Sequence, residues 1–481
     1  MSDVFGSGLP VKIGLAIAAQ LSLAACASFS PDGGMSTVQE TAAIELGKDV
    51  VKETSAFEAA LVGDRVRELL GRSLTADAAV QIALLNNQGL QASYNELGIS
   101  EAQYVQASLP PNPTVFLQKT VAPNSLGFTE AVTGNLFALV TFPARRDIAE
   151  TQFQAAQLRA IEATLRLTAD VRRHYWRAVA AQELVRLLNE ARGSAGASAD
   201  LAKALGQSGA MNRLDQSREF AFYAETSGRL ADVRVQEKVE HERLARLMGL
   251  WNRNSIYTLP ARLPALPAKL TSSGLIEAHA MERRVDLRLA RTNLEIFAKT
   301  LGLTHATRYI NASALGPLRE YEKTVTGGQS PERFDRYGVQ ITFEIPLYDF
   351  GETRTRDAEE TYMQAAHLLA EKAVNVRSEV REAFIAYKGA FEVARLYQAQ
   401  VVPLQNQILK QSLLQTSTGQ TDVFVLVQDA RNRILAQVTA LNARREFWIA
   451  DTDLRAAIIG GGMAGRTDGA GAAASGSGGQ K

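Results

Sequence analysis

The sequence predicts a mainly α-helical fold made of duplicated long-helix hairpins, with a small contribution from β-strands. Apolar residues step by three or four along most of the stretch from Glu352 to about Thr416, the spacing of a helix that packs along one face. The same order of helices, strands and breaks occurs twice, at an offset of about 200 residues, which indicates an internal duplication. Four short strand candidates lie between the helices, and one of them alternates cleanly between apolar and polar residues.

The composition excludes several classes of protein. The 481 residues include 52 Lys and Arg against 51 Asp and Glu, so the chain lacks the excess of positive charge that nucleic acid binding requires. The histidines are scattered, without a His-Glu-x-x-His motif or a Cys/His cluster, so we expect no metal site and no cofactor. No nucleophile–base pair and no glycine-rich phosphate loop is visible. We therefore do not expect an enzyme.

The N-terminus has the pattern of a processing signal. Lys12 precedes an apolar stretch that is too short, and too interrupted by polar residues, to remain as a transmembrane helix. The stretch ends in Leu-Ala-Ala directly before Cys26, the only cysteine, and this resembles the lipobox of bacterial lipoproteins. The resemblance implies a signal peptide over residues 1–25 and acylation of Cys26, for example with palmitate. The alternative is an ordinary secretory signal with an inert thiol.

An N-terminal extended leader is expected over residues 26–72, and the first structural repeat over residues 73–259. Thr75 can cap the first helix of this repeat, and the Pro-Pro-Asn-Pro run at 110–113 must end it. Gly209 lies in the break between two later helices. The predicted elements are helices 76–109, 144–205 and 212–250 and strands 114–121 and 135–142.

The second structural repeat covers residues 260–459, after a linker with several prolines, and Gly419 lies in the break that matches Gly209. Helices of about 60 residues would be about 90 Å long, which predicts an elongated array of paired helices. The Gly/Ala-rich tail, residues 460–481, is predicted to be disordered. The predicted elements are helices 273–306, 352–416 and 422–459 and strands 309–318 and 337–347.

The segment from Tyr337 to Pro346 alternates cleanly between apolar and polar residues. A Glu on a buried sheet face would be costly, whereas a membrane strand with a lipid-facing apolar side and a wet side accommodates it. This places Gln340 and Glu344 in the lumen of a barrel. A half-exposed soluble sheet has the same period, so both interpretations stay open. Because a small barrel needs about eight strands, four per chain must be pooled, and three chains would supply twelve.

Four segments together resemble the TolC-like outer-membrane efflux family, over residues 73–459. They are Leu74–Leu90, Val105–Pro113, Glu344–Glu352 and Gly419–Leu426. The resemblance implies a homotrimer with a shared 12-stranded transmembrane β-barrel and a trimeric α-barrel tunnel through the periplasm. It also implies a passive exit duct in the bacterial outer membrane, contacting outer-membrane lipid. A periplasmic adaptor (membrane fusion) protein and an inner-membrane pump would be its partners.

The resemblance also implies roles for the two helix breaks. Gly209 and Gly419 would form periplasmic hairpin tips that dock the adaptor, because glycine permits a tight reversal with positive φ. Gln420 and Thr421 would contact the adaptor. The alternative is a turn without any contact.

Charged residues follow both breaks. Arg213, Asp215 and Asp422 are candidates for the periplasmic gate, since the resemblance implies ion pairs and carboxylate rings at a closed entrance. The alternative is that they are solvated charges at helix starts, with Asp422 as an N-cap.

The exported substrate stays open between small molecules and metal ions. The segment from Val80 to Val105, with the Pro-Pro-Asn-Pro break that follows it, looks most like ducts paired with heavy-metal or copper exporters. Two other functions remain as alternatives: the duct of a type I protein secretion system, and a lipid-anchored periplasmic scaffold of coiled coils without a pore.

Overall fold

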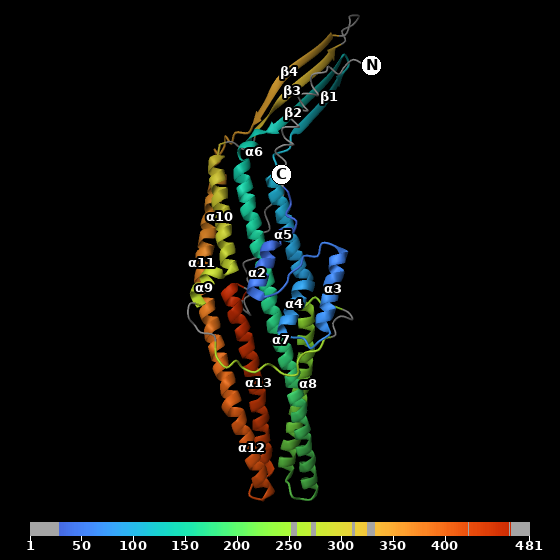
Figure 1. Ribbon diagram of the computed structural model, residues 1–481, viewed down its shortest axis with the longest axis vertical. Helices are drawn as coiled ribbons and strands as arrows, with labels where there is room; N and C mark the ends of the chain where they lie inside the picture. The colour runs from blue at the N-terminus through green and yellow to red at the C-terminus, as the bar shows by residue number, and fades with distance from the viewer. Residues whose placement is uncertain are drawn as a thin grey trace. The chain divides into compact units, whose positions relative to one another are not determined.

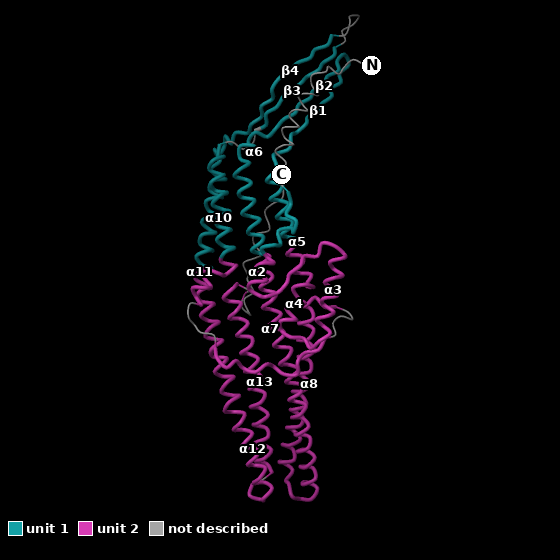
Figure 2. The backbone as a smooth tube through the Cα atoms, viewed as in Figure 1, with its two compact units in different colours: residues 1–37, 95–159, 288–372 teal, residues 38–94, 160–287, 373–481 magenta. Residues whose placement is uncertain are grey.

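The computed structural model describes residues 28–251, 257–270, 276–309, 313–324, 332–421, 423–460 and 462. The expectations for the signal peptide, Cys26, Asp422 and most of the tail lie outside these residues. The chain divides into two compact units (Figure 2). Unit 1 consists of residues 1–37, 95–159 and 288–372, and unit 2 of residues 38–94, 160–287 and 373–481. Each unit therefore takes segments from both predicted repeats.

The described chain is mainly helical and has one sheet, which confirms the predicted fold class at this level (Figure 1). The helices are α2 (Ser36–Leu46), α3 (Ala56–Leu70), α4 (Ala76–Asn86), α5 (Gln88–Ala107), α6 (Leu136–Val140), α7 (Phe142–Gln207), α8 (Arg213–Leu247), α9 (Ile276–Arg283), α10 (Val285–Ala306), α11 (Glu352–Leu396), the π-helix η3 (Tyr397–Val401), α12 (Val402–Ser417) and α13 (Val423–Ile459). The strands are β1 (Thr114–Ala122), β2 (Ser125–Asn135), β3 (Ser313–Thr324) and β4 (Glu332–Phe343).

The first helix of each repeat is broken, and the prediction of single helices over 76–109 and 273–306 was wrong. In the first repeat the break is Asn87, whose backbone is extended and whose side chain donates to the carbonyl of Leu247 at 2.9 Å. The neighbouring Asn86 side chain donates to the carbonyls of Met248 and Gly249. These side-chain bonds satisfy carbonyls at the C-terminal end of α8, which a helix end leaves without a partner inside the helix.

The break in the second repeat is Arg284, which is buried. Its guanidinium binds Asp286 through two bonds of 3.0 and 2.7 Å and Glu379 on α11 at 2.7 Å. It also donates to the carbonyl of Ala457 near the end of α13. A buried guanidinium is tolerated here because two carboxylates and a carbonyl surround it.

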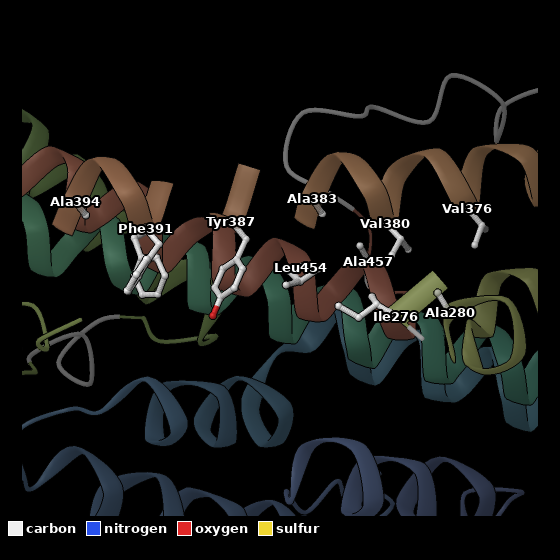
Figure 3. Close-up of a cluster of buried hydrophobic side chains, with 11 residues drawn as sticks. Ile276, Ala280, Val376, Val380, Ala383, Tyr387, Phe391, Ala394, Leu454 and Ala457 are labelled. Carbon is white, nitrogen blue, oxygen red and sulfur yellow. The ribbon is translucent and has the colours of Figure 1, made fainter. Parts of the chain in front are cut away.

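Apolar side chains of α9, α11 and α13 form the core of this part of unit 2 (Figure 3). The ring of Phe447 is fully buried, with its centroid 5.5 Å from that of Tyr387 and 5.6 Å from that of Phe391. Aromatic rings at such distances add to the free energy gained from burial. The remaining members of this core are Ile276, Ala280, Val376, Val380, Ala383, Ala394, Leu454 and Ala457.

The predicted helix 352–416 contains one π-helical turn, η3, between α11 and α12. There the amide of Val402 donates to the carbonyl of Tyr397, five residues back. Pro403 follows directly, and its ring nitrogen has no hydrogen for the α-helical bond to the carbonyl of Ala399. The π-turn accommodates the proline without ending the helix.

The segment expected to be an extended leader, residues 26–72, contains two helices, α2 and α3. Ser55 caps α3 by accepting a bond from the amide of Glu58. Polar contacts hold the rest of the segment: the amide of Ser30 donates to Glu101 at 2.6 Å, and the Gln91 side chain donates to the carbonyl of Val51 at 2.8 Å. The apolar spacing was too weak to predict these helices.

The sheet has the order β1-β2-β3-β4, with every neighbouring pair antiparallel. β1 was predicted nearly to its ends. The strand predicted over 135–142 was wrong, because its apolar run forms α6, capped by the Asn135 side chain at the amide of Ala138. A short apolar run does not distinguish a helix from a strand. β2 instead occupies the preceding residues.

The other two predicted strands, 309–318 and 337–347, were displaced from the observed β3 and β4. The missed parts are residues 319–324 and 332–336, and they are rich in charge. Because charged residues are depleted in strands, the sequence pattern predicted a loop for these residues. They form the ends of the strands next to the connection between β3 and β4.

Candidate functional site

The two hairpin tips have the same backbone geometry. Gly209 and Gly419 have φ of +77° and +69°, a left-handed conformation that favours glycine. In each tip the amide after the glycine donates to the carbonyl five positions back at 2.9 Å, from Ala210 to Leu205 and from Gln420 to Gln415. This is the hydrogen-bond pattern of a Schellman helix end. The prediction that both glycines make tight reversals is confirmed.

The predicted adaptor-contacting residues lie on the second tip. Gln420 is exposed and Thr421 is half-buried. The Thr421 hydroxyl donates to the Gln415 side chain at 3.1 Å, which fixes it locally. Their contact with an adaptor stays a prediction.

Asp215 and Asn212 form a reciprocal cap at the start of α8. The amide of Asp215 donates to Asn212 Oδ1 at 2.9 Å, and Asn212 Nδ2 donates to Asp215 Oδ2 at 2.7 Å. Arg218 pairs with the same carboxylate at 3.0 Å. Arg213 is exposed. The geometry gives Asp215 a capping role, which matches the alternative of a helix-start charge, and the gate role of these residues stays a prediction.

An ion pair connects α8 and α13, and the sequence analysis did not predict it. Glu219 is only 3% exposed, and its Oε1 lies 3.7 Å from Nη2 of Arg431. The Arg431 guanidinium also donates to the Arg218 carbonyl at 3.0 Å and lies 4.1 Å from the Phe222 ring centroid. Burial raises the pKa of the Glu219 carboxyl, and the charge of Arg431 opposes that rise. This pair joins the two hairpins.

A signal for this pair exists in the sequence. Glu219 and Arg431 lie about ten and about twelve residues after the two tip glycines, so each is about 15–18 Å along its returning helix. Opposite charges at matched heights on two returning helices are candidates for an ion pair. Which faces of α8 and α13 meet is set by packing and could not be read from the sequence.

The sheet exposes apolar side chains on β4. Tyr337, Val339, Ile341 and Phe343 are 68%, 69%, 64% and 62% exposed. Gln340 is exposed and lies opposite Gly316 on β3, and Glu344 follows the end of the strand. An exposed apolar row of this kind needs covering in the working protein.

The segment Glu344–Glu352 makes a tight turn between β4 and α11. Asp349 accepts a bond from the amide of Gly351 at 3.0 Å and one from the Thr353 hydroxyl, and these bonds lower the pKa of its carboxyl. Gly351 has φ of +73°, and a Cβ there would lie 2.2 Å from the Arg308 carbonyl oxygen. The turn therefore needs both an acceptor at 349 and a glycine at 351.

No described helix is both long and apolar enough to cross a membrane. Nor does the described part of the chain group three His, Cys, Asp or Glu side chains in a way that would hold a metal ion.

No protein-family model and no curated protein sequence matches the chain. Solved structures match it over most of its length. The CmeC outer membrane channel of Campylobacter jejuni superposes with a TM-score of 0.67 at 16% identity, covering 89% of this chain and 93% of that one. The MtrE outer membrane channel of Neisseria gonorrhoeae, in its open state, gives 0.66 at 18%, covering 82% and 89%. The outer membrane protein VceC of Vibrio cholerae gives 0.63 at 16%, covering 84% and 97%. The chain has the fold of these proteins.

Proposed function

We propose that this chain is the TolC-like outer-membrane channel of a tripartite efflux system, a passive exit duct and not an enzyme. The observation that carries the proposal is the four-stranded sheet. It has two free edges, β1 and β4, and an exposed apolar face, on a fold shared with outer membrane channels. A free edge and an apolar face are costly in water.

Three chains that pair β4 of one with β1 of the next would give a closed 12-stranded barrel, in which every backbone group has a partner. Directly opposed residues of an antiparallel sheet lie on the same face. The row Leu117, Glu130, Arg319 and Tyr337 thereby shares a face with Val339 and Ile341. We call this the outer face, facing lipid.

The other face, the lumen face, carries the polar side chains of Gln340 and Thr342. Thr342 and Gln340 on β4 lie beside Ala314 and Gly316 on β3. Gln340 would hydrate the channel, and Glu344 would do so just beyond the strand. Polar interiors of this kind are typical of water-filled membrane barrels.

The helical hairpins would then extend into the periplasm, with the tips at Gly209 and Gly419 docking an adaptor that connects to an inner-membrane pump. Acylation of Cys26 would anchor each chain to the outer membrane. The cargo would be small molecules or metal ions, chosen by the pump.

The test is to express the chain with its own N-terminus, extract the outer membrane in detergent, and measure particle mass and planar-bilayer conductance together. A conducting particle with the mass of three chains supports the duct. A water-soluble particle without conductance, released when Cys26 is replaced by Ser, would leave only the periplasmic scaffold.

A further inference from the structure

Two basic side chains lie directly opposite each other on the outer face. Lys323 on β3 pairs in register with Arg333 on β4. Like charges in opposed positions of an antiparallel pair repel each other. Among the described residues, neither side chain has an acidic partner within salt-bridge distance, and Arg333 is exposed. Within the part of the chain that the structure describes, the pair therefore has no counter-charge.

The nearby carboxylates do not supply one. Glu322 and Glu332 are sequence neighbours of the pair and, because side chains alternate along a strand, they lie on the lumen face. Asp335 is on the outer face, but it pairs with Arg319 at 3.1 Å. Directly beside the pair, the acidic side chains Glu322 and Glu332 thus lie on the lumen face, whereas Lys323 and Arg333 lie on the outer face.

The rest of the row is apolar. Leu126 on β2 lies opposite Lys323, and Val121 on β1 lies opposite Leu126. Val121 is 70% exposed. The row therefore has two apolar side chains, on β1 and β2, followed by two basic side chains, on β3 and β4. A ligand that matches it has an anionic head and an apolar body.

The row lies at the end of the sheet away from the helices. The turn between β1 and β2, the last residues of β3 and the first residues of β4 are all at this end, whereas α6 follows the other end of β2 (Figure 1). If the helices are periplasmic, as the proposed function requires, this row meets the leaflet that faces the cell exterior.

We propose that Lys323 and Arg333 bind a phosphate-bearing lipid headgroup of the outer leaflet, with its acyl chains along Leu126 and Val121. A lysine and an arginine together suit a phosphate, the lysine as a point charge and the arginine through paired hydrogen bonds. The inference rests on the proposed function, because it requires the sheet to be in a membrane.

The test compares two lipids that differ only in phosphate: lipid A with both phosphates, and the same lipid A after enzymatic dephosphorylation. Native mass spectrometry of the detergent-solubilised full chain would count the bound molecules. We expect wild type to favour the phosphorylated lipid and Arg333→Gln to bind it about fivefold less. The matched control is Arg336→Gln, on the same strand but on the lumen face opposite Glu320, which should bind like wild type.

Equal binding of both lipids, or equal losses in Arg333→Gln and Arg336→Gln, would overturn the inference. Complete displacement of the lipid by excess inorganic phosphate would also overturn it, since an ion site alone would then explain the binding. A flotation assay with phosphatidylethanolamine vesicles separates the two proposals. A chain that inserts but ignores phosphate contradicts only the lipid site, whereas a chain that never inserts contradicts both.

Discussion

The carboxylate of Glu219 on α8 and the guanidinium of Arg431 on α13 meet at 3.7 Å and connect the two hairpins of unit 2. Glu219 Oε2 is buried and has no hydrogen-bond partner among the described residues, so the carboxylate is only partly compensated. Such a group is more easily protonated than an exposed glutamate. The contact between the hairpins should therefore respond to pH.

The first prediction concerns this response. Because burial raises the folded-state pKa of Glu219 above 4.5, the folded protein retains a proton that the unfolded chain has already lost. The contribution of Glu219 to stability should therefore fall as the pH rises from the pKa of the unfolded chain through the raised pKa of the folded protein. Glu219→Gln should flatten the dependence of Tm on pH above pH 4.5, where the raised pKa of Glu219 acts. Glu225→Gln, an exposed glutamate on the same helix, should leave the dependence as in wild type. Identical slopes in all three proteins would refute the assignment.

The second prediction concerns the tips. Gly209→Ala should cost about 1–2 kcal/mol, because an L-residue must adopt positive φ there. No atom lies within 4 Å of the added Cβ, so the cost is conformational only. The control is Gly228→Ala inside α8, also without a neighbour within 4 Å, which should stabilise by about 1 kcal/mol. Thermal unfolding followed by circular dichroism checks both, and a stabilising Gly209→Ala would be the contrary result.

The third prediction concerns Arg284. Arg284→Met removes the two bonds that the guanidinium donates to the buried Asp286 and should cost about 3–5 kcal/mol. Arg283→Gln, in the adjacent position, loses only a largely exposed contact to Glu45 at 3.9 Å and should change stability by less than about 1 kcal/mol. Chemical denaturation distinguishes them, and similar costs for both would show that the buried network contributes little.

The fourth prediction concerns the turn before α11. Asp349→Ala should destabilise the protein, and Asp349→Asn, which keeps an acceptor for the Gly351 amide, should do so less. Since the pKa of Asp349 is lowered in the folded state, its contribution is present above pH 3.8 and is lost as pH falls through the lowered value. Asp357→Ala, an exposed position further along α11, is the control. Melting curves at neutral and acidic pH test the ranking.

The sequence predicted the long helices well and their interruptions poorly. α7 and α8 lie within a few residues of their predicted ends, because apolar spacing, prolines and glycines mark them locally. The break at Asn87 depends on carbonyls at the end of α8, more than 150 residues away, so no local pattern shows it. The π-turn at η3 did have a local signal in Pro403.

In the candidate site, too, features with a local sequence signal were predicted and features that depend on packing were not. The positive φ of Gly209 and Gly419 followed from residue type and position, and Thr75 caps α4 as expected. The pair of Glu219 and Arg431 needed the packing of α8 against α13. The charged halves of β3 and β4 were missed because their strand form depends on pairing with each other.

In the proposed channel, the free edges of three sheets close on one another. A panel of variants with Cys26 replaced by Ser, one Cys on β1 and one on β4, would be oxidised in outer membranes and separated by denaturing electrophoresis. For the pairs in register, we predict cross-linked species of two and three chains and none larger. Only single chains across the whole panel, or a ladder that continues beyond three, would contradict it.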